Sequence, residues 1–580
     1  MLNLPRTLVC GLTLGAVAAV GATAPGPART DEMVVSLPPM IVEGKNRPLA
    51  WRYLAGPDVE LLTVCNDSNA VEFVRRNHRL NELLHVLVPE KYLFKTVVPE
   101  IHILFNEDTG RARSEEVIRE MVKAHGAQVT PTGTVLPGPE VEMPDTRLPG
   151  IGRVKLKPQR YLFLPNMRLT DLDGQAVFAI LTDSGRRLNF TFTDDRVEFL
   201  LTRRAPALPD WLIEGLMGVY RRSELLVDEI RIKPLGWPAT VLPAATPRDP
   251  PQPRSLLPMT ELFERRRPVG EEPADDELRH WQAQCALFVQ WTMAENNPLR
   301  RAALWQFVDR LEKEPLTEAL FEQCFGICFS DMLVRLHAYL PLAAGRNLVL
   351  DTPKGERLAG LKSRPATDLE IARIRGDWER LEIDYVRRYH PELAAKYVEL
   401  ARATLLRVYG RGERDPRLLV ALGLTELGAG DEAAARGFLE AAQAGGPVRP
   451  RARLELARLR YAALPAEGKL SAAQAATVLE PLRHMSWDEP PLMGPYALFA
   501  TVWTRSATPP GAEEIARLNE GARYFPQASA YLLRVIYFNV AAGQVATARE
   551  LAESGWRHAR DPEMRERLAR VRDELAAMRP

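Results

Sequence analysis

The sequence predicts an α+β region with a small mixed sheet, followed by an all-α region of helical repeats. Short apolar segments rich in β-branched and aromatic residues occur between about residues 33 and 200. Such segments become rare after about residue 260, where apolar residues recur at helical spacing. The chain has 580 residues, of which 46% are hydrophobic, so it is long enough for several domains with buried cores.

The first 24 residues have the three parts of a secretory signal peptide. Arg6 is followed by an uncharged run over residues 7–24 that ends in small residues, and Pro25 then breaks the pattern. Cleavage after Ala22 fits better than cleavage after Ala24, because Pro25 would directly follow the second cut. The alternative is an uncleaved anchor, for which this run is short and diluted with small residues. We expect export to the periplasm or the medium.

The charge and cysteine content exclude several classes of protein. The 76 basic and 75 acidic residues nearly cancel, and no long block of one sign occurs. This argues against nucleic acid or an anionic membrane as the main partner. Five cysteines, one of them in the signal, are too few for a disulfide scaffold. Cys285, Cys324 and Cys328 are either buried free thiols or include one disulfide to Cys285.

The strand-rich part begins with a strand–helix–strand unit. A helix over Asn69–Leu87, with apolar residues at helical spacing, separates the first two predicted strands. The segments with strand character are Leu61–Cys65, Ile101–Phe105, Tyr161–Leu164, Ala176–Leu181 and Leu188–Phe192. The proline-rich stretch 127–158 predicts a surface loop, and residues 234–258 predict a second connector.

Beyond residue 390, small residues recur with the phase of paired helices. Gly423 and Ala457 are one period of about 34 residues apart, and Pro447 follows the predicted second helix. This pattern resembles a tetratricopeptide repeat, in which small residues allow two antiparallel helices to approach. We expect a first domain over residues 33–345, a helical linker over 346–390 and repeats over 391–580.

One motif lies after the strand-rich part. Trp211, Glu214, Gly215 and Tyr220 form a Trp-x-x-Glu-Gly-x-x-x-x-Tyr element. The element resembles the gluzincin-type (peptidase MA-like) zinc metallopeptidase-like proteins, and the likeness extends over about residues 50–342. The resemblance implies that Glu214 stands at the position of the third metal ligand and that Glu198 stands at the position of the general base.

The sequence departs from that family at the other two metal ligands. A zinc site of this kind needs two histidines four residues apart on one helix, with the glutamate between them. With Glu198 as the base, these positions hold Val197 and Leu201, which have no lone pair for a metal. None of the nine histidines is four residues from another. We therefore expect no metal, no cofactor and no catalysis, with Glu198 and Glu214 as vestigial positions or structural carboxylates.

The function predicted is that of an exported, non-catalytic binding or scaffold protein whose repeats hold a peptide or protein partner. Aromatic and arginine side chains dominate interface hot spots, although each one can equally serve helix packing. The candidate contacts are Arg458, Tyr461, Tyr496 and Trp503. One alternative is a hydrolase with an unconventional site around Glu198 and Glu214. Another is an envelope component that assembles with copies of itself.

Overall fold

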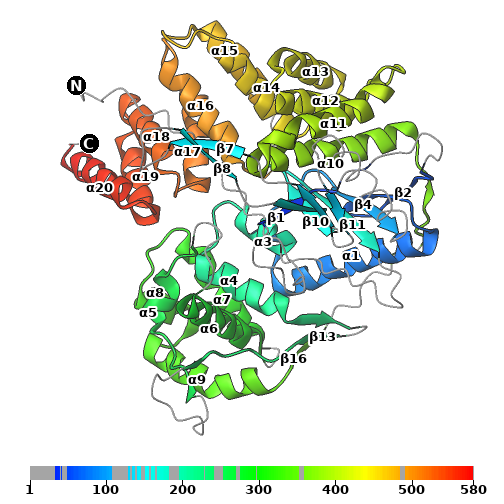
Figure 1. The fold of residues 1–580 in the computed structure, drawn as a ribbon. Coiled ribbons are helices and arrows are strands. Elements are labelled where there is room, and N and C mark those ends of the chain that lie inside the picture. The colour runs from blue at the N-terminus through cyan, green and yellow to red at the C-terminus, as the bar shows by residue number, and fades with distance from the viewer. Residues whose placement is uncertain are drawn as a thin grey trace.

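The computed structural model contains a mixed α+β N-terminal region and a helical C-terminal region (Figure 1). The predicted signal peptide and the predicted strand Leu188–Phe192 lie outside the described residues. The structure describes residues 33–39, 41, 49–106, 128–130, 133–136, 140–144, 151–155, 159–163, 166–181, 195–226, 229–240, 252–268, 275–294, 297–351, 358, 360–483 and 490–578.

A six-stranded sheet forms the centre of the N-terminal region. Its strands follow the order β10 (Asn166–Thr170), β11 (Gln175–Leu181), β4 (Glu100–Asn106), β3 (Val59–Thr63), β2 (Arg52–Ala55) and β17 (Arg364–Pro365). The central neighbours β11, β4 and β3 are parallel, and the outer pairs are antiparallel. The predicted strands near residues 61, 101 and 176 are thereby confirmed.

The two faces of this sheet are covered by different helices. Leu61 and Leu104 pack with α1 (Asp67–Leu87), the predicted connecting helix between β3 and β4. Leu62 and Phe178 pack on the opposite face, against α10 (Asp368–Tyr389). Side chains alternate between the faces of a strand, so each strand supplies both layers of core. Figure 1 shows α1 and α10 on opposite sides of the sheet.

The proline-rich stretch 127–158 forms strands, so the prediction of a loop there was wrong. The second sheet has the order β1 (Met33–Leu37), β9 (Gln159–Phe163), β6 (Gly133–Leu136) and β5 (Gln128–Thr130). A separate pair joins β7 (Glu140–Pro144) to β8 (Ile151–Lys155). Pro144 is the last residue of β7, an end position where a missing N–H is tolerated.

A helical body follows the sheet region. It has one aromatic core, in which Trp211, Trp281, Phe288, Phe307 and Phe321 are almost fully buried. β12 (Ser223–Leu225), β13 (Glu229–Ile232) and β16 (Leu348–Asp351) form a small antiparallel sheet beside it. The helices are α3 (Asp195–Thr202), α4 (Asp210–Arg221), α5 (Met259–Glu264), α6 (Asp276–Met293), α7 (Pro298–Leu311), α8 (Glu318–Phe325) and α9 (Phe329–Gly345).

Glycines bring α4 and α6 into close contact. A Cβ atom on Gly215 would lie 2.5 Å from Val289 Cγ2 and 2.7 Å from the carbonyl oxygen of Cys285. A Cβ atom on Gly218 would lie 2.7 Å from the Cβ of Ala286. Any side chain at Gly215 would therefore push the two helices apart. This contact fixes the position of Glu214, the residue before Gly215.

Two helices of this body have marked apolar character. Within the described ranges, no single helix has both the length and the hydropathy of a membrane span. The bent pair α8 and α9 passes this test when the two are combined, by length and composition only. Leu320, Phe321, Met332 and Leu336 of this pair are buried in the aromatic core.

The C-terminal region is a stack of helices in which each contacts the next (Figure 1). The even-numbered helices from α10 to α20 also each contact the next even-numbered helix. This is the contact pattern of stacked helix pairs. The helices after α10 are α11 (Ala394–Tyr409), α12 (Pro416–Ala429), α13 (Glu432–Gly445), α14 (Pro450–Ala462), α15 (Ala472–Arg483), α16 (Met493–Arg505), α17 (Ala512–Tyr524), α18 (Ser529–Ala541), α19 (Val545–His558) and α20 (Pro562–Ala577).

Residues 346–390, predicted as a helical linker, make extensive contacts with both regions. β16 and β17 pair with strands of the N-terminal region. The apolar residues Ile374, Trp378 and Leu381 recur along α10 at helical spacing and are buried against the six-stranded sheet. The same helix contacts α11 and α12. The segment therefore joins the sheet and the helical stack into one packed structure.

Candidate functional site

The two glutamates singled out by the sequence meet at one arginine. Glu198 lies on α3, Glu214 lies on α4, and Arg267 follows α5. The distance from Arg267 Nη2 to Glu198 Oε1 is 2.5 Å, and that from Arg267 Nε to Glu214 Oε1 is 2.6 Å. One guanidinium thus bridges the two carboxylates. We call these three residues the Arg267 cluster.

Further polar groups hold this cluster in place. Gln282 of α6 donates from Nε2 to Glu214 Oε2 at 2.9 Å, which occupies the second oxygen of that carboxylate. The backbone N–H of Arg267 donates to Asp210 Oδ2 at 3.3 Å. Arg560, which follows α19, reaches Asp210 Oδ1 at 3.3 Å. The end of the helical stack therefore contacts the helix that carries Glu214.

The electrostatics of the cluster stabilise a charged arginine. The side chains of Glu214, Glu198 and Arg267 are 6%, 20% and 23% exposed, so water reaches the cluster only in part. Burial acts to lower the pKa of Arg267, but the carboxylates of Glu214 and Glu198 outweigh it and raise that pKa. The arginine thus stays protonated and neutralises part of the negative charge at all ordinary pH values.

Val197 and Leu201, which the sequence resemblance compares with metal-binding histidines, face the core. Val197 is 1% exposed and Leu201 is 0% exposed, and both belong to the aromatic core of the helical body. Burial of each side chain stabilises α3 by roughly 1.5–3 kcal/mol. Both glutamates that could hold a cation already share Arg267. These residues do not fit a catalytic zinc ion, which requires three protein ligands and an open position.

The Trp–Glu–Gly–Tyr element has a clear packing role in this structure. Trp211 is 1% exposed and contacts Phe263 and Phe288 edge to face. Gly215 allows the close approach of α6, and Glu214 binds Arg267 and Gln282. The arrangement has a fixed cation between two carboxylates, so neither glutamate is placed to accept a proton from water as a free base.

No disulfide bond joins any two of the described cysteines. Cys285, Cys324 and Cys328 are free thiols in the described part of the chain. Burial, together with the nearby Glu214 carboxylate, raises the pKa of Cys285, so its thiolate is disfavoured. Across the described ranges, no three His, Cys, Asp or Glu side chains are grouped as a metal site.

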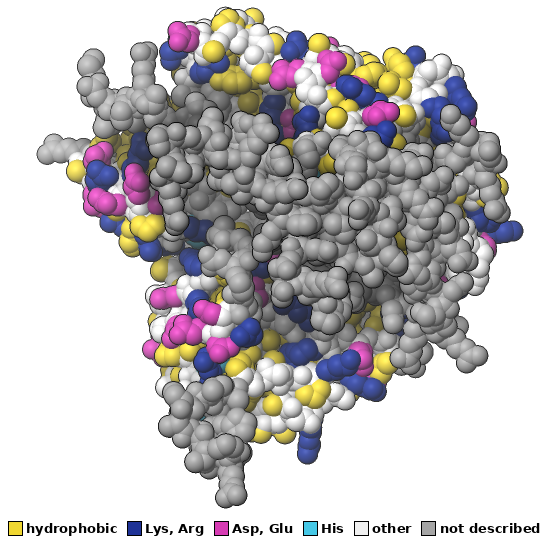
Figure 2. Space-filling model, in the orientation of Figure 1, with side chains coloured by type: hydrophobic (Ala, Val, Ile, Leu, Met, Phe, Trp, Pro, Cys, Tyr) yellow, Lys and Arg dark blue, Asp and Glu magenta, His cyan; other side chains and the backbone are white. Residues whose placement is uncertain are grey.

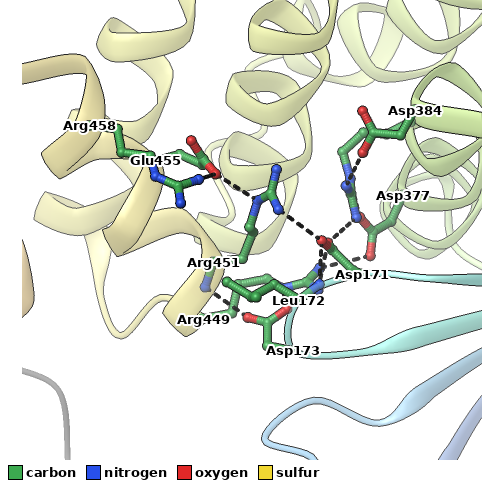
Figure 3. Close-up of polar contacts among 10 residues, drawn as sticks. Asp171, Leu172, Asp173, Asp377, Asp384, Arg449, Arg451, Glu455 and Arg458 are labelled. Atoms are coloured by element: carbon green, nitrogen blue, oxygen red, sulfur yellow. Dashed lines mark hydrogen bonds and ion pairs between the residues drawn. The ribbon is translucent and has the colours of Figure 1, made fainter. Parts of the chain in front are cut away.

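A second and larger charged cluster joins the sheet to the helical stack (Figure 3). Asp171 and Asp173 lie in the turn between β10 and β11, where the N–H of Asp171 donates to the carbonyl oxygen of Gly174 at 2.8 Å. Arg380 of α10 lies 2.7 Å from Asp171, and Arg449, the residue before α14, lies 3.0 Å from it. Asp377 of α10 contacts both arginines. We call Asp171, Asp173, Asp377, Arg380 and Arg449 the Asp171 cluster.

This cluster is almost fully removed from water. The side chains of Asp173, Arg380 and Asp171 are 0%, 2% and 3% exposed. Burial alone would raise the pKa of Asp171, but Arg380 and Arg449 overcome it and hold that pKa far below its ordinary value. Asp173 also accepts from the backbone N–H of Arg451 at 2.8 Å, which caps the start of α14.

The four candidate partner contacts all have contacts within the helical stack. Arg458 pairs with Glu455 at 2.8 Å and is 45% exposed. The guanidinium of Arg505 lies 5.1 Å from the ring centre of Tyr461. Tyr496 packs beside Gly521, whose Cβ would lie 2.4 Å from Tyr496 Cδ1. Trp503 is partly buried against the core of α14 to α20.

An open groove lies elsewhere on the stack, between α13, α14 and α15. Its volume is about 600 Å³, and its lining is charged and of mixed sign. Arg460 lies 2.8 Å from Glu480 within it. The lining residues are Arg436, Glu440, Arg460, Ala463, Ala476, Thr477, Glu480 and Arg483. On the face seen in Figure 2, basic and acidic side chains are likewise interspersed where side chains are coloured.

Sequence reasoning missed Arg267 as the partner of both glutamates. It stands at the end of an Arg265-Arg266-Arg267 run, more than 50 residues after Glu214 in the chain. That run was the one available signal, because three successive arginines beside a proline-rich connector indicate that carboxylates elsewhere in the chain pair with them. Nothing in the spacing shows which of the three turns toward Glu214.

Comparison with known proteins gives no family assignment. No protein-family model matches this sequence, and no curated protein matches it either. The structure consists of a mixed α+β region and a stack of paired helices. In the first region, Arg267 bridges the glutamates of α3 and α4. Buried ion pairs of Asp171 with Arg380 and Arg449 join the two regions.

Proposed function

We propose that this chain is an exported, non-catalytic binding protein, in which a degenerate zinc-peptidase-like region supports TPR-like repeats that hold a peptide or protein partner. The observation that carries the proposal is the bridge from Arg267 to Glu198 and Glu214. In a working site of this type, those two carboxylates would serve a metal and its bound water. Here the guanidinium of Arg267 forms ion pairs with both carboxylates.

The helical stack supports the binding role. Each even-numbered helix contacts the next, as in repeats that build an extended surface. A Cβ on Gly423 would lie 2.7 Å from Leu439 Cγ, so the small residue permits the contact between α12 and α13. We place the partner in the groove between α13, α14 and α15, where Thr477 and Arg483 are exposed.

The non-catalytic part is tested by metal analysis and hydrolysis assays on the full chain purified without chelators. We expect far less than one zinc per chain and no cleavage of unfolded substrates above that of the Glu214→Gln variant. Stoichiometric zinc, with activity that the same substitution abolishes, would establish a hydrolase around Glu198 and Glu214 instead.

The binding part is tested with arrays of overlapping peptides from exported proteins, probed with the full chain. Arg483→Glu reverses one groove charge, and Thr477→Trp fills part of the groove. We expect each to weaken peptide binding several-fold. The matched control is Arg567→Glu, an exposed arginine on α20, and it should bind as the parent does. Unchanged binding by both groove variants would exclude this surface.

Sedimentation in dilute solution separates the proposal from the envelope-component alternative. A binding protein of this kind is expected to sediment as a monomer. A concentration-dependent assembly of the full chain would favour repeats that associate with copies of themselves.

A further inference from the structure

A cavity of about 270 Å³ lies where the sheet meets the helical stack. Its walls are formed by the segment leading into β4, the turn between β10 and β11, α10, and the first turns of α12 and α14. Asp171, Asp377, Arg380 and Arg449 of the Asp171 cluster are among its lining residues. The cavity is separate from the Arg267 cluster, with which it shares no lining residue.

The wall of the cavity has more positive than negative side chains. Five arginines line it, against three carboxylates. Glu60 already receives both Nη groups of Arg373, and Arg417 lies 3.7 Å from the same carboxylate. Arg417 is 63% exposed and stands at the open side of the cavity. The five arginines are Arg373, Arg380, Arg417, Arg449 and Arg453.

A buried donor on the same wall has no acceptor. Gln175 is 6% exposed, and its Oε1 accepts from Arg168 Nη1 at 3.1 Å. Its Nε2 has no hydrogen-bond partner among the described residues. An unpaired buried N–H donor is unfavourable by roughly 1–3 kcal/mol and favours a nearby acceptor. The wall thus has one buried donor that lacks an acceptor.

The rest of the wall is apolar. Val98, Leu381, Val420 and Val448 line it together with several prolines. α12 and α14 both begin at the cavity, so the positive ends of their helix dipoles lie beside it. Asp415 and Asp173 already accept hydrogen bonds from the first backbone N–H groups of these helices. An oxyanion would accept hydrogen bonds from the arginines of this wall, and a short apolar body would contact its apolar side chains.

From these features we infer that the cavity binds a small organic oxyanion, a carboxylate or phosphate group on an apolar body. Arginine forks recognise both groups through paired N–H donors. A ligand here would contact the sheet, α10 and the first repeat helices together. The inference goes beyond the proposed function, because neither the metal analysis nor the peptide array bears on this cavity.

Calorimetric titration of the full chain at low salt tests it, with inorganic phosphate, benzoate and phenyl phosphate as probes. We expect benzoate or phenyl phosphate to bind one per chain and several-fold more tightly than inorganic phosphate. The tighter of these two shows whether the preferred group is a carboxylate or a phosphate. Added salt should weaken binding, because charge contributes to it.

Matched variants locate the binding. Arg417→Gln combined with Arg453→Gln should weaken it by at least about tenfold, as expected for the loss of charge-assisted hydrogen bonds. Arg567→Gln, which removes one exposed charge on α20, should leave affinity unchanged. Should the double variant fold poorly, Arg417→Gln alone serves, because that side chain is largely exposed. The inference would be overturned if no probe bound at concentrations up to about 10 mM, which corresponds to very weak affinity. Equal binding by the parent and the double variant would also overturn it.

Discussion

The Arg267 cluster and the Asp171 cluster both join carboxylates to arginines from distant parts of the chain, but their exposure differs. In the first, Arg267 is 23% exposed and Glu198 is 20% exposed. In the second, Arg380 and Asp171 are 2% and 3% exposed. Water can therefore solvate a broken Arg267–Glu198 pair much better than a broken Arg380–Asp171 pair.

This difference indicates different roles. A buried charge without its partner is strongly destabilising, so the Asp171 cluster ties the sheet, α10 and α14 into a single arrangement. The Arg267 cluster instead holds Glu198 and Glu214, the two glutamates singled out by the sequence resemblance, in partly exposed ion pairs. The Asp171 cluster is therefore expected to contribute more to stability than the Arg267 cluster does. Four predictions test this comparison.

The largest effect is expected from Arg380→Met, which removes the cation between Asp171 and Asp377. The two carboxylates would remain buried with less compensation, so the free energy of unfolding should fall by about 3–5 kcal/mol. Urea unfolding followed by circular dichroism measures this. Arg567→Met, at an exposed arginine of α20, is the control and should change stability by less than about 0.5 kcal/mol.

A smaller effect is expected from Arg267→Met. Glu214 keeps its hydrogen bond from Gln282 but loses its ion pair, so the free energy of unfolding should fall by about 1–3 kcal/mol. Glu198→Gln with Glu214→Gln in the same background should restore part of the loss, because no unpaired charge remains. If Arg267→Met destabilised the chain more than Arg380→Met, the comparison above would be reversed.

The pH dependence of stability should come mainly from the buried cluster. The folded pKa of Asp171 is far below its unfolded value, so its contribution is fully present above about pH 4. That contribution is lost as the pH falls below this value toward the folded pKa. Denaturation at pH 7 and pH 3 should show a smaller loss of stability in Asp171→Asn than in the parent. Equal losses would contradict the assignment.

The smallest effect is expected from Arg458→Ala. This arginine is 45% exposed and pairs with Glu455 three residues earlier on α14. Exposed pairs of this kind contribute about 0.2–1 kcal/mol, so the thermal midpoint should change little. A reduction in peptide binding without a change in stability would support Arg458 as a partner contact. A large loss of stability would show that it belongs to the buried cluster.

Much of the N-terminal fold was predictable because its signals are local. The strands near residues 61, 101 and 176 and the helix Asn69–Leu87 follow from apolar runs and helical spacing, which depend only on neighbours in the chain. The strands within residues 127–158 were not predicted, because the abundance of prolines outweighed the short β-branched runs between them.

The candidate site was predictable only in part. The resemblance of the Trp–Glu–Gly–Tyr element singled out Glu198 and Glu214, and it compares Val197 and Leu201 with metal-ligand positions. Only the tertiary structure decided that Arg267 bridges them and that Asp171 meets Arg449, 278 residues away. The physical reason is that burial imposes a periodic pattern on neighbouring residues. An ion pair between distant segments leaves no such pattern, and its partners are fixed only when the helices pack.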